Sequence, residues 1–143
     1  FTNPENIDQN NLIIFENSLC FETSDFQNNK FKKLYIISNK NENRCIKLSE
    51  KVLKFKSSLI QDQEQRFKNQ SIDCEVIDIS EIKKIEKAVG LYPTVGENLD
   101  YLNSNTFKIN ILYRELDQNS WQYCNKGFFN FKNYIPKIIS TLN

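Results

Sequence analysis

The feature that most constrains the fold is a strand–helix–strand unit between residues 33 and 80. KLYIIS (33–38) is a short apolar run that ends in a polar cluster, which is typical of a buried strand. A long helical pattern follows it, and SIDCEVIDIS (71–80) predicts a second strand. Because a helical crossover joins strands in parallel, this unit predicts an α/β fold.

The connecting helix is predicted from about residue 45 to about residue 68. Leu48, Val52, Phe55 and Leu59 recur at spacings of 4, 3 and 4, which is the periodicity of one helix face. Charged residues, mostly lysines, lie on the opposite face. The segment is therefore predicted to be an amphipathic helix.

The rest of the chain is predicted to complete a mixed sheet flanked by helices. Two short apolar runs flank Asn125-Lys126-Gly127, which is a hairpin signal, so the last strands are expected to be antiparallel. In chain order the other predictions are short strands at 12–15 and 18–21, a helix from Ser80 to a C-terminal stop at Gly90, a loop at 96–105, a strand at 107–116 and a closing helix at 133–143.

Length and composition restrict the class of protein. With 143 residues and a hydrophobic fraction of 39%, the chain is long enough to form one globular domain with its own core. Its 19 basic and 18 acidic residues give a net charge of +1, which argues against nucleic acid as the main partner. No run of about 18 apolar residues is present, so no transmembrane segment is predicted.

The cysteines and the absence of histidine limit the chemistry. Cys20, Cys45, Cys74 and Cys124 form no CxxC pair and fit no zinc spacing, so no metal site is predicted. Free or buried thiols are the favoured interpretation, although the even number also allows two disulfides in an oxidising compartment. Without His or a glycine-rich phosphate loop the sequence shows no complete catalytic set, and no cofactor is predicted.

The order of elements resembles the thioredoxin-like fold. The similar features are the strand-to-helix turn SNKNENRC (38–45), the apolar-Pro-Thr segment LYPTV (91–95), and a hairpin followed by a terminal helix. The resemblance implies that Pro93 is a cis-proline candidate. It also implies an N-terminal arm with short strands at 1–30 and a thioredoxin-like domain at 31–143.

The place of the redox dithiol is altered in this sequence. Glu42 stands where the first cysteine of a thioredoxin motif belongs, and Cys45 stands at the second position. A helix N-terminus and the neighbouring Arg44 would stabilise a thiolate, but a carboxylate cannot form a disulfide and would raise a nearby thiol pKa. Cys45 is therefore the one candidate catalytic residue, with packing at the helix start as the favoured interpretation.

A second resemblance concerns the C-terminal third. ILYRE (111–115), Trp121, Tyr123 and Gly127 are similar in order to a small accessory subunit of mitochondrial respiratory complex I and to related mitochondrial ribosomal proteins. The near-neutral charge favours the respiratory subunit. This resemblance implies a non-catalytic accessory subunit of a respiratory-chain complex, bound to other protein subunits and peripheral to the inner membrane. The opening Phe1-Thr2, without Met, is typical of a cleaved mitochondrial presequence, and secretory cleavage is the alternative.

The C-terminal aromatic residues are the predicted interface. FFNF has apolar residues at adjacent positions, so one face of that segment is expected to meet a partner or to be covered by the chain itself. The interface candidates are Trp121, Tyr123, Phe128, Phe129 and Phe131.

Two alternative functions stay open from the sequence. One is a divergent monothiol redox protein acting through Cys45. The other is a secreted thioredoxin-like binding domain, in which the glycosylation sequon at Asn69 would matter.

Overall fold

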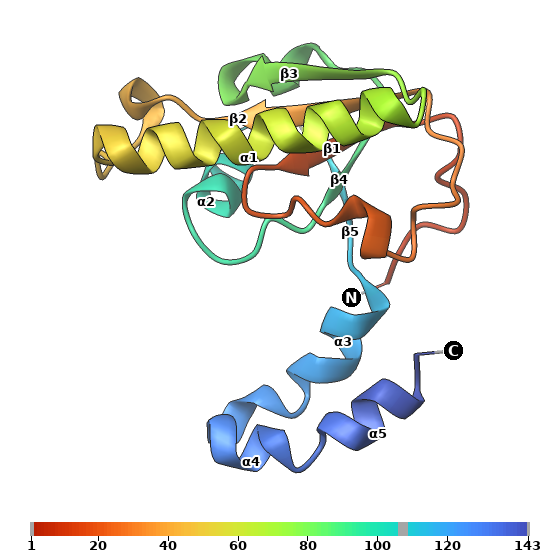
Figure 1. The fold of residues 1–143 in the computed structure, drawn as a ribbon. Coiled ribbons are helices and arrows are strands. Elements are labelled where there is room, and N and C mark those ends of the chain that lie inside the picture. The colour runs from red at the N-terminus through yellow and green to blue at the C-terminus, as the bar shows by residue number, and fades with distance from the viewer. Residues whose placement is uncertain (1, 106–108, 143) are drawn as a thin grey trace.

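The computed structural model describes residues 2–105 and 109–142, which form an α/β fold around a parallel sheet (Figure 1). Within these residues the sheet has five strands in the order β3-β2-β1-β4-β5, and every neighbouring pair is parallel. The strands are β1 (Asn11–Phe15), β2 (Lys33–Ser38), β3 (Cys74–Asp78), β4 (Ala88–Leu91) and β5 (Asn110–Leu112). The α/β class is confirmed, whereas the prediction of a mixed sheet with antiparallel strands is wrong.

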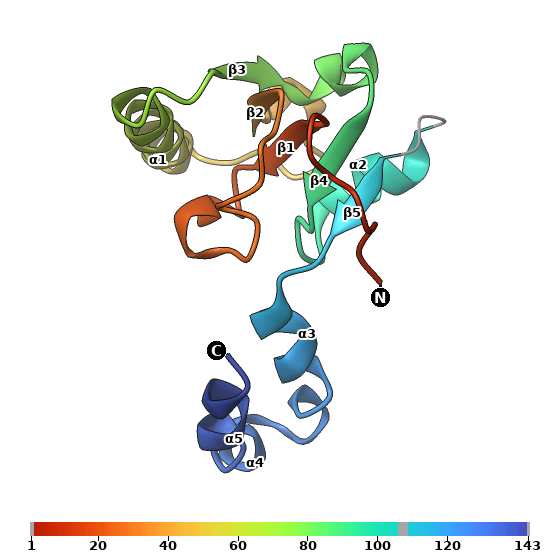
Figure 2. The same ribbon diagram turned by 90° about the vertical axis from the view of Figure 1, so that its right-hand side faces the viewer.

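The chain winds outward in both directions from β1. Strands β1, β2 and β3 follow one another toward one edge, and the chain then returns to place β4 and β5 on the other side of β1. Helix α1 (Glu50–Asn69) covers one face, whereas the 3₁₀ helix η3 (Ile79–Lys84) and α2 (Glu97–Ser104) lie on the other (Figure 2). Right-handed crossovers require this change of face when the winding direction reverses. The reversal lies between β1 and β4.

Strand β1 is buried on both faces. Its alternate side chains join two hydrophobic cores, one beneath α1 and one beneath η3 and α2. The first core includes Leu12, Ile14, Ile60 and Phe67, and the second includes Ile13, Phe15, Ile79 and Ile82. A continuous apolar run is typical of a central parallel strand, which explains why LIIF is a reliable strand signal.

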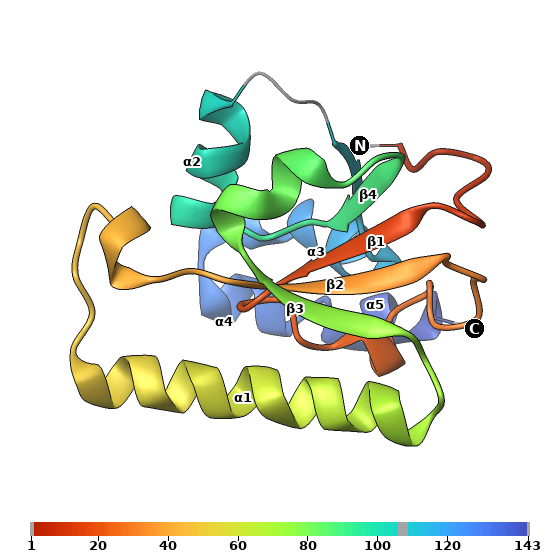
Figure 3. The same ribbon diagram turned by 90° about the horizontal axis from the view of Figure 1, so that it is seen from above.

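Only the C-terminal half of α1 packs on the sheet. Its buried side chains are Ile60, Gln63 and Phe67. Val52, Phe55 and Leu59, which belong to the predicted apolar stripe, are instead exposed by 40%, 63% and 41%. The helix begins at Glu50 behind the N-cap Ser49, so a long loop over residues 39–49, which includes the 3₁₀ helix η2 (Asn41–Asn43), joins the end of β2 to α1 (Figure 3).

The structure corrects the prediction between residues 80 and 105. Asp78, not Ser80, is the N-cap, and the predicted helix is the short η3 followed by β4. Gly90 does not stop a helix but lies inside β4, where an added Cβ would lie 3.4 Å from a side-chain carbon of Ile109. The predicted loop at 96–105 contains α2.

Two more predicted strands differ in the structure. Residues 18–21 are not a strand, and Phe21 begins the 3₁₀ helix η1 (Phe21–Thr23). The predicted strand at 107–116 is confirmed over β5 only, and its residues 107 and 108 lie outside the described residues.

The C-terminal segment forms a helical arm instead of a hairpin. It consists of α3 (Glu115–Trp121), the 3₁₀ helix η4 (Cys124–Lys126), α4 (Phe128–Lys132) and α5 (Ile135–Ser140). Gly127 has the expected positive φ, 79°, but precedes α4 as its N-cap. The closing helix is confirmed as α5. The arm extends away from the sheet below α3, as Figure 1 shows.

The N-terminal segment is held against this domain. The Asn3 side chain donates to the Tyr113 carbonyl oxygen and accepts from the Tyr113 N–H, and the Asp8 carboxylate accepts from Asn29 and from the Lys30 N–H. The division expected at residue 30 falls between β1 and β2, which are neighbours in the same sheet.

Candidate functional site

All five strands point their carboxyl ends to the same edge of the sheet. In open parallel sheets, ligands bind outside this edge, near the point where the winding direction reverses. Here Glu16 and Asn17 follow β1 directly, Asn39 follows β2 directly, and the loop from Tyr92 to Gly96 joins β4 to α2. The carboxyl edge is therefore the expected place for a site in this fold.

A buried arginine organises this edge. The Arg44 side chain is 1% exposed, and its Nη2 donates to Glu16 Oε1 at 2.7 Å and to the Asn39 carbonyl oxygen at 2.8 Å. Its Nη1 donates to the Glu97 carboxylate. Lys56 Nζ also donates to Glu16 Oε1, at 3.0 Å. One guanidinium thus connects the ends of β1 and β2 to the first turn of α2.

A second polar group closes the reversal point itself. Asn17 Nδ2 donates to the Pro93 carbonyl oxygen and to Thr94 Oγ1, and Asn98 Nδ2 donates to Asn17 Oδ1 at 3.3 Å. Thr94 has a φ of 62°, which is unusual for a β-branched residue. These contacts tie the loop between β4 and α2 to the end of β1.

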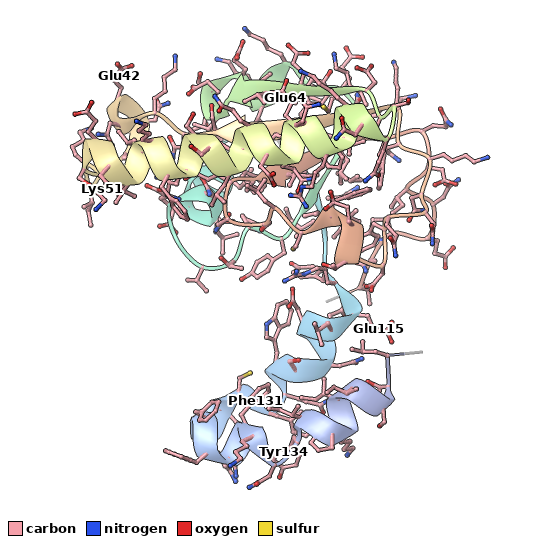
Figure 4. All side chains as sticks on the ribbon, in the orientation of Figure 1. Glu42, Lys51, Glu64, Glu115, Phe131 and Tyr134 are labelled. Carbon is pink, nitrogen blue, oxygen red and sulfur yellow. The ribbon has the colours of Figure 1, made fainter. Side chains whose placement is uncertain are left out.

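A pocket of about 500 Å³ lies beside this network, beneath the middle of α1, where residues between Leu53 and Glu64 line it. Its polar side comes from the strand ends and the loop after β2, including Glu16, Asn39 and Arg44. Its apolar side comes from Leu53 and Ile60 of α1 and from Val76 of β3. Figure 4 shows Glu42 on the loop and Glu64 on α1, which both also line the pocket.

Cys45 does not have the surroundings that the sequence suggested. It is exposed on the loop between β2 and α1, five positions before α1 begins, so its thiol does not stand in the first turn of that helix. The neighbouring Arg44 guanidinium is occupied by Glu16 and Glu97. Neither activating condition is therefore met in the form that the sequence suggested, since Cys45 does not begin α1 and the guanidinium is held in two ion pairs.

Pro93 follows a trans peptide bond, because the described residues contain no cis bond. Its fully buried ring lies two residues after the end of β4, at the reversal point, where its carbonyl oxygen accepts from Asn17. The cis-proline interpretation is thus wrong, although the segment does lie at the edge where sites are found.

The aromatic candidates divide into three groups. The Trp121 ring packs edge to face against Tyr92 and Tyr113, at 5.5 and 5.8 Å between centroids, which connects α3 to the sheet domain. Other rings of the arm pack on one another: Tyr123 stacks on Tyr134 at 4.3 Å, and Phe131 is half-buried. Phe128 and Phe129 are exposed by 66% and 84%, so these two match the predicted interface best. Figure 4 shows Phe131 and Tyr134 on the arm.

All four cysteines are unpaired in the structure. Burial raises the pKa of the Cys20 thiol, although the Arg114 guanidinium, whose Nη1 lies 2.6 Å from its sulfur, opposes the rise. Within residues 2–105 and 109–142, no group of three or more His, Cys, Asp or Glu side chains is arranged to hold a metal ion. None of the helices in those ranges is both long and apolar enough to cross a membrane.

Comparison with protein-family models, with curated proteins and with solved structures finds no match to this chain. The interpretation of the site therefore depends on the geometry of its residues alone.

The sequence did not single out Glu16, Asn39, Asn98 or the pairing role of Arg44. A signal was present, because Glu16 and Asn39 each follow a buried apolar run directly, as residues at the carboxyl ends of parallel strands do. The sequence analysis predicted antiparallel strands, and the carboxyl ends of strands meet at one edge only when all the strands run in the same direction. The two residues were therefore not expected to lie together.

Proposed function

We propose that this protein is a non-catalytic interaction domain, an accessory subunit that binds another protein through the N-terminal half of α1. The observation that carries the proposal is the exposed stripe of Val52, Phe55 and Leu59. These residues are spaced three and four apart, so they form one continuous helix face. Ile46, exposed by 79%, precedes them on the loop.

The chemistry of this face indicates its partner. Fully burying an apolar side chain of this kind is worth about 1.5–3 kcal/mol, so three or four such residues favour a partner that covers them. Lys51 and Lys54 are exposed on the same two turns (Figure 4 labels Lys51). An apolar groove with an acidic rim would complement both properties, which is the helix-in-groove mode of recognition.

The helical arm supplies a second exposed apolar surface. Besides Phe128 and Phe129, Ile139 on α5 is exposed by 61%. Several exposed large apolar residues on two elements are typical of a chain that works inside an assembly.

The experiment compares the native size of the protein with and without the stripe. Cell extracts prepared without harsh detergent are fractionated by size, and the chain is detected by antibody. We expect the wild type to elute well above its own 16.9 kDa. Phe55→Ser removes the most exposed side chain of the stripe. This variant should elute closer to the size of a single chain.

The matched control is Gln65→Ser, which changes an exposed polar residue of the same helix. It should leave the elution of the wild type unchanged. Elution of the wild type as a single chain, or equal behaviour of the two variants, would rule out this function.

The compartment and the assembly stay predictions from the sequence. They are a mitochondrial location peripheral to the inner membrane, a respiratory-chain complex, and a thioredoxin-like ancestry. The interaction proposed here depends on none of them, and identification of the proteins that coelute with the wild type would test the first two.

A further inference from the structure

We propose that the pocket beneath the middle of α1 binds an unphosphorylated ribonucleoside. The proposed protein interaction uses the outer stripe of α1, none of whose residues lines this pocket. The volume of about 500 Å³ lies within the range of about 300–1,000 Å³ that is usual for small-molecule sites. The pocket also adjoins the carboxyl edge, where parallel sheets bind ligands.

The polar end of the pocket needs hydrogen-bond donors. Asn39 is 7% exposed, and its side-chain oxygen is buried with no partner in the described part of the chain. A buried acceptor without a partner lowers stability, and a donor from a ligand that reaches it would remove that cost. Glu16, whose side chain is 3% exposed, receives both Arg44 and Lys56 on the same oxygen, Oε1.

Ribose hydroxyls are the donors that fit this arrangement. An ionised carboxylate has about four acceptor positions, so Glu16 can accept further hydrogen bonds beside its two ion pairs. In dinucleotide-binding folds, a carboxylate near this edge of the sheet takes the ribose 2′-hydroxyl. Glu16 and Asn39 follow the ends of two neighbouring parallel strands and both line the pocket, so they offer it a carboxylate and an amide.

The other end of the pocket suits a base. Leu53, Ile60 and Val76 form an apolar wall between α1 and the sheet edge. Gln61 on α1 and Ser38 at the end of β2 also line the pocket and can pair with the polar edge of a ring. An apolar surface with few polar groups is the usual composition of a small-molecule site.

The charges that line the pocket indicate that the ligand needs no phosphate group for binding. Its lining has three cations, Lys40, Arg44 and Lys56, and three carboxylates, Glu16, Glu42 and Glu64. Two of the cations are ion-paired to Glu16. A phosphate would therefore meet no excess of positive charge, and none of the three glycines of the chain lines the pocket to form a phosphate loop.

The test is calorimetric titration of the full chain with adenosine, guanosine, cytidine and uridine in turn. We expect saturable binding of at least one of them. Its 2′-deoxy counterpart should bind at least about tenfold more weakly, since about 1.4 kcal/mol is lost with one hydrogen bond to a charged group. The corresponding 5′-triphosphate should bind no more tightly than the nucleoside.

A matched pair of variants locates the ligand. Ser57 lines the pocket from α1, and its neighbour Ser58 does not, while both are exposed. Ser57→Trp should fill the pocket and abolish binding, whereas Ser58→Trp should bind as the wild type does. Circular dichroism spectra of both variants check that α1 is retained.

The proposal is overturned if none of the four nucleosides binds at millimolar concentration. It is equally overturned if Ser57→Trp binds like the wild type, if the deoxynucleoside or free ribose binds as tightly, or if the triphosphate binds more than about tenfold better. None of these results affects the elution experiment on Phe55, because the two surfaces share no residue.

Discussion

The two halves of α1 carry the same kind of sequence and play different parts. The C-terminal half presses Phe67 and Ile60 into the core beside β1 and β2. In the N-terminal half Phe55 and Leu59 are exposed to solvent, while residues on the inner side of the helix line a pocket. Both halves have the apolar periodicity of an amphipathic helix. They differ in whether the sheet covers their apolar side chains.

This contrast shows what an apolar stripe establishes and what it leaves open. The stripe proves that a helix is amphipathic, but it does not show whether the chain's own sheet covers the apolar face. In this protein the strand ends determine the coverage. Because β2 ends at Ser38, the N-terminal part of α1 extends beyond the carboxyl edge of the sheet. The predictions below test whether the two halves differ as the structure indicates.

The largest expected effect comes from Phe67→Ala in the buried half. Removing a fully buried ring leaves a cavity in the core beneath α1, where Phe67 packs against Phe21 at 5.4 Å between centroids. We expect the free energy of unfolding to fall by about 3–5 kcal/mol, measured by urea denaturation. Phe55→Ala on the exposed half should change it by less than about 0.5 kcal/mol. Similar losses for the two would erase the distinction between the halves.

Arg44→Met should have the next largest effect, because it removes the residue that holds the loop before α1. The variant leaves the Glu16 carboxylate buried with Lys56 as its remaining ion-pair partner. Breaking a buried ion pair costs about 3–5 kcal/mol. Because Lys56 still pairs with Glu16, the free energy of unfolding should fall by about 3 kcal/mol, at the lower end of this range.

The double variant Arg44→Met, Glu16→Gln provides the control in the same denaturation experiment. Removing the stranded charge should restore part of the lost stability. If the double variant is less stable than Arg44→Met, the carboxylate does not cause the loss.

The central part of the fold could be predicted from the sequence. β1, β2 and β3 are short apolar runs, and α1 has a clear helical period, so the parallel unit at residues 33–80 follows from pattern and handedness. α5 was also found, because Pro136 and the spaced isoleucines mark a helix.

The rest could not be predicted because short apolar runs do not distinguish a strand from a helical turn. FFNF forms part of α4, and its two exposed phenylalanines have neither the alternation of a strand nor a core to fill. Gly90 matches a helix stop, yet its role is to admit Ile109 beside β4, which only the pairing with β5 reveals. The site was missed for the same reason: Glu16, Asn39 and Arg44 meet only once the strand order is known.

A smaller effect concerns pH, since the loop before α1 is also held by Asp78. Burial raises the pKa of this carboxyl, but hydrogen bonds from Ser80 and Asn43 outweigh it and lower the pKa below its ordinary value near 3.8. A lowered folded pKa stabilises the fold above the unfolded pKa, and this contribution is lost as the pH falls through the folded pKa. Asp78→Asn should therefore weaken the fall in unfolding free energy between about pH 4.5 and pH 2. An unchanged pH profile would show that these hydrogen bonds do not stabilise the ionised form.

The smallest effect is expected at Cys45, on the exposed loop that leads into the exposed half of α1. Cys45→Ser should alter the free energy of unfolding by less than about 0.5 kcal/mol, since the side chain lies outside the core. Alkylation of the folded protein at pH 7, followed residue by residue by mass spectrometry, should modify Cys45 at the rate of a model thiol peptide. Cys20 should react more slowly, because a raised pKa leaves less thiolate and the residue is half-buried. Reaction of Cys45 far faster than the peptide would contradict this expectation and favour a redox role for the loop, because Cys45 does not begin α1 and the Arg44 guanidinium is already ion-paired.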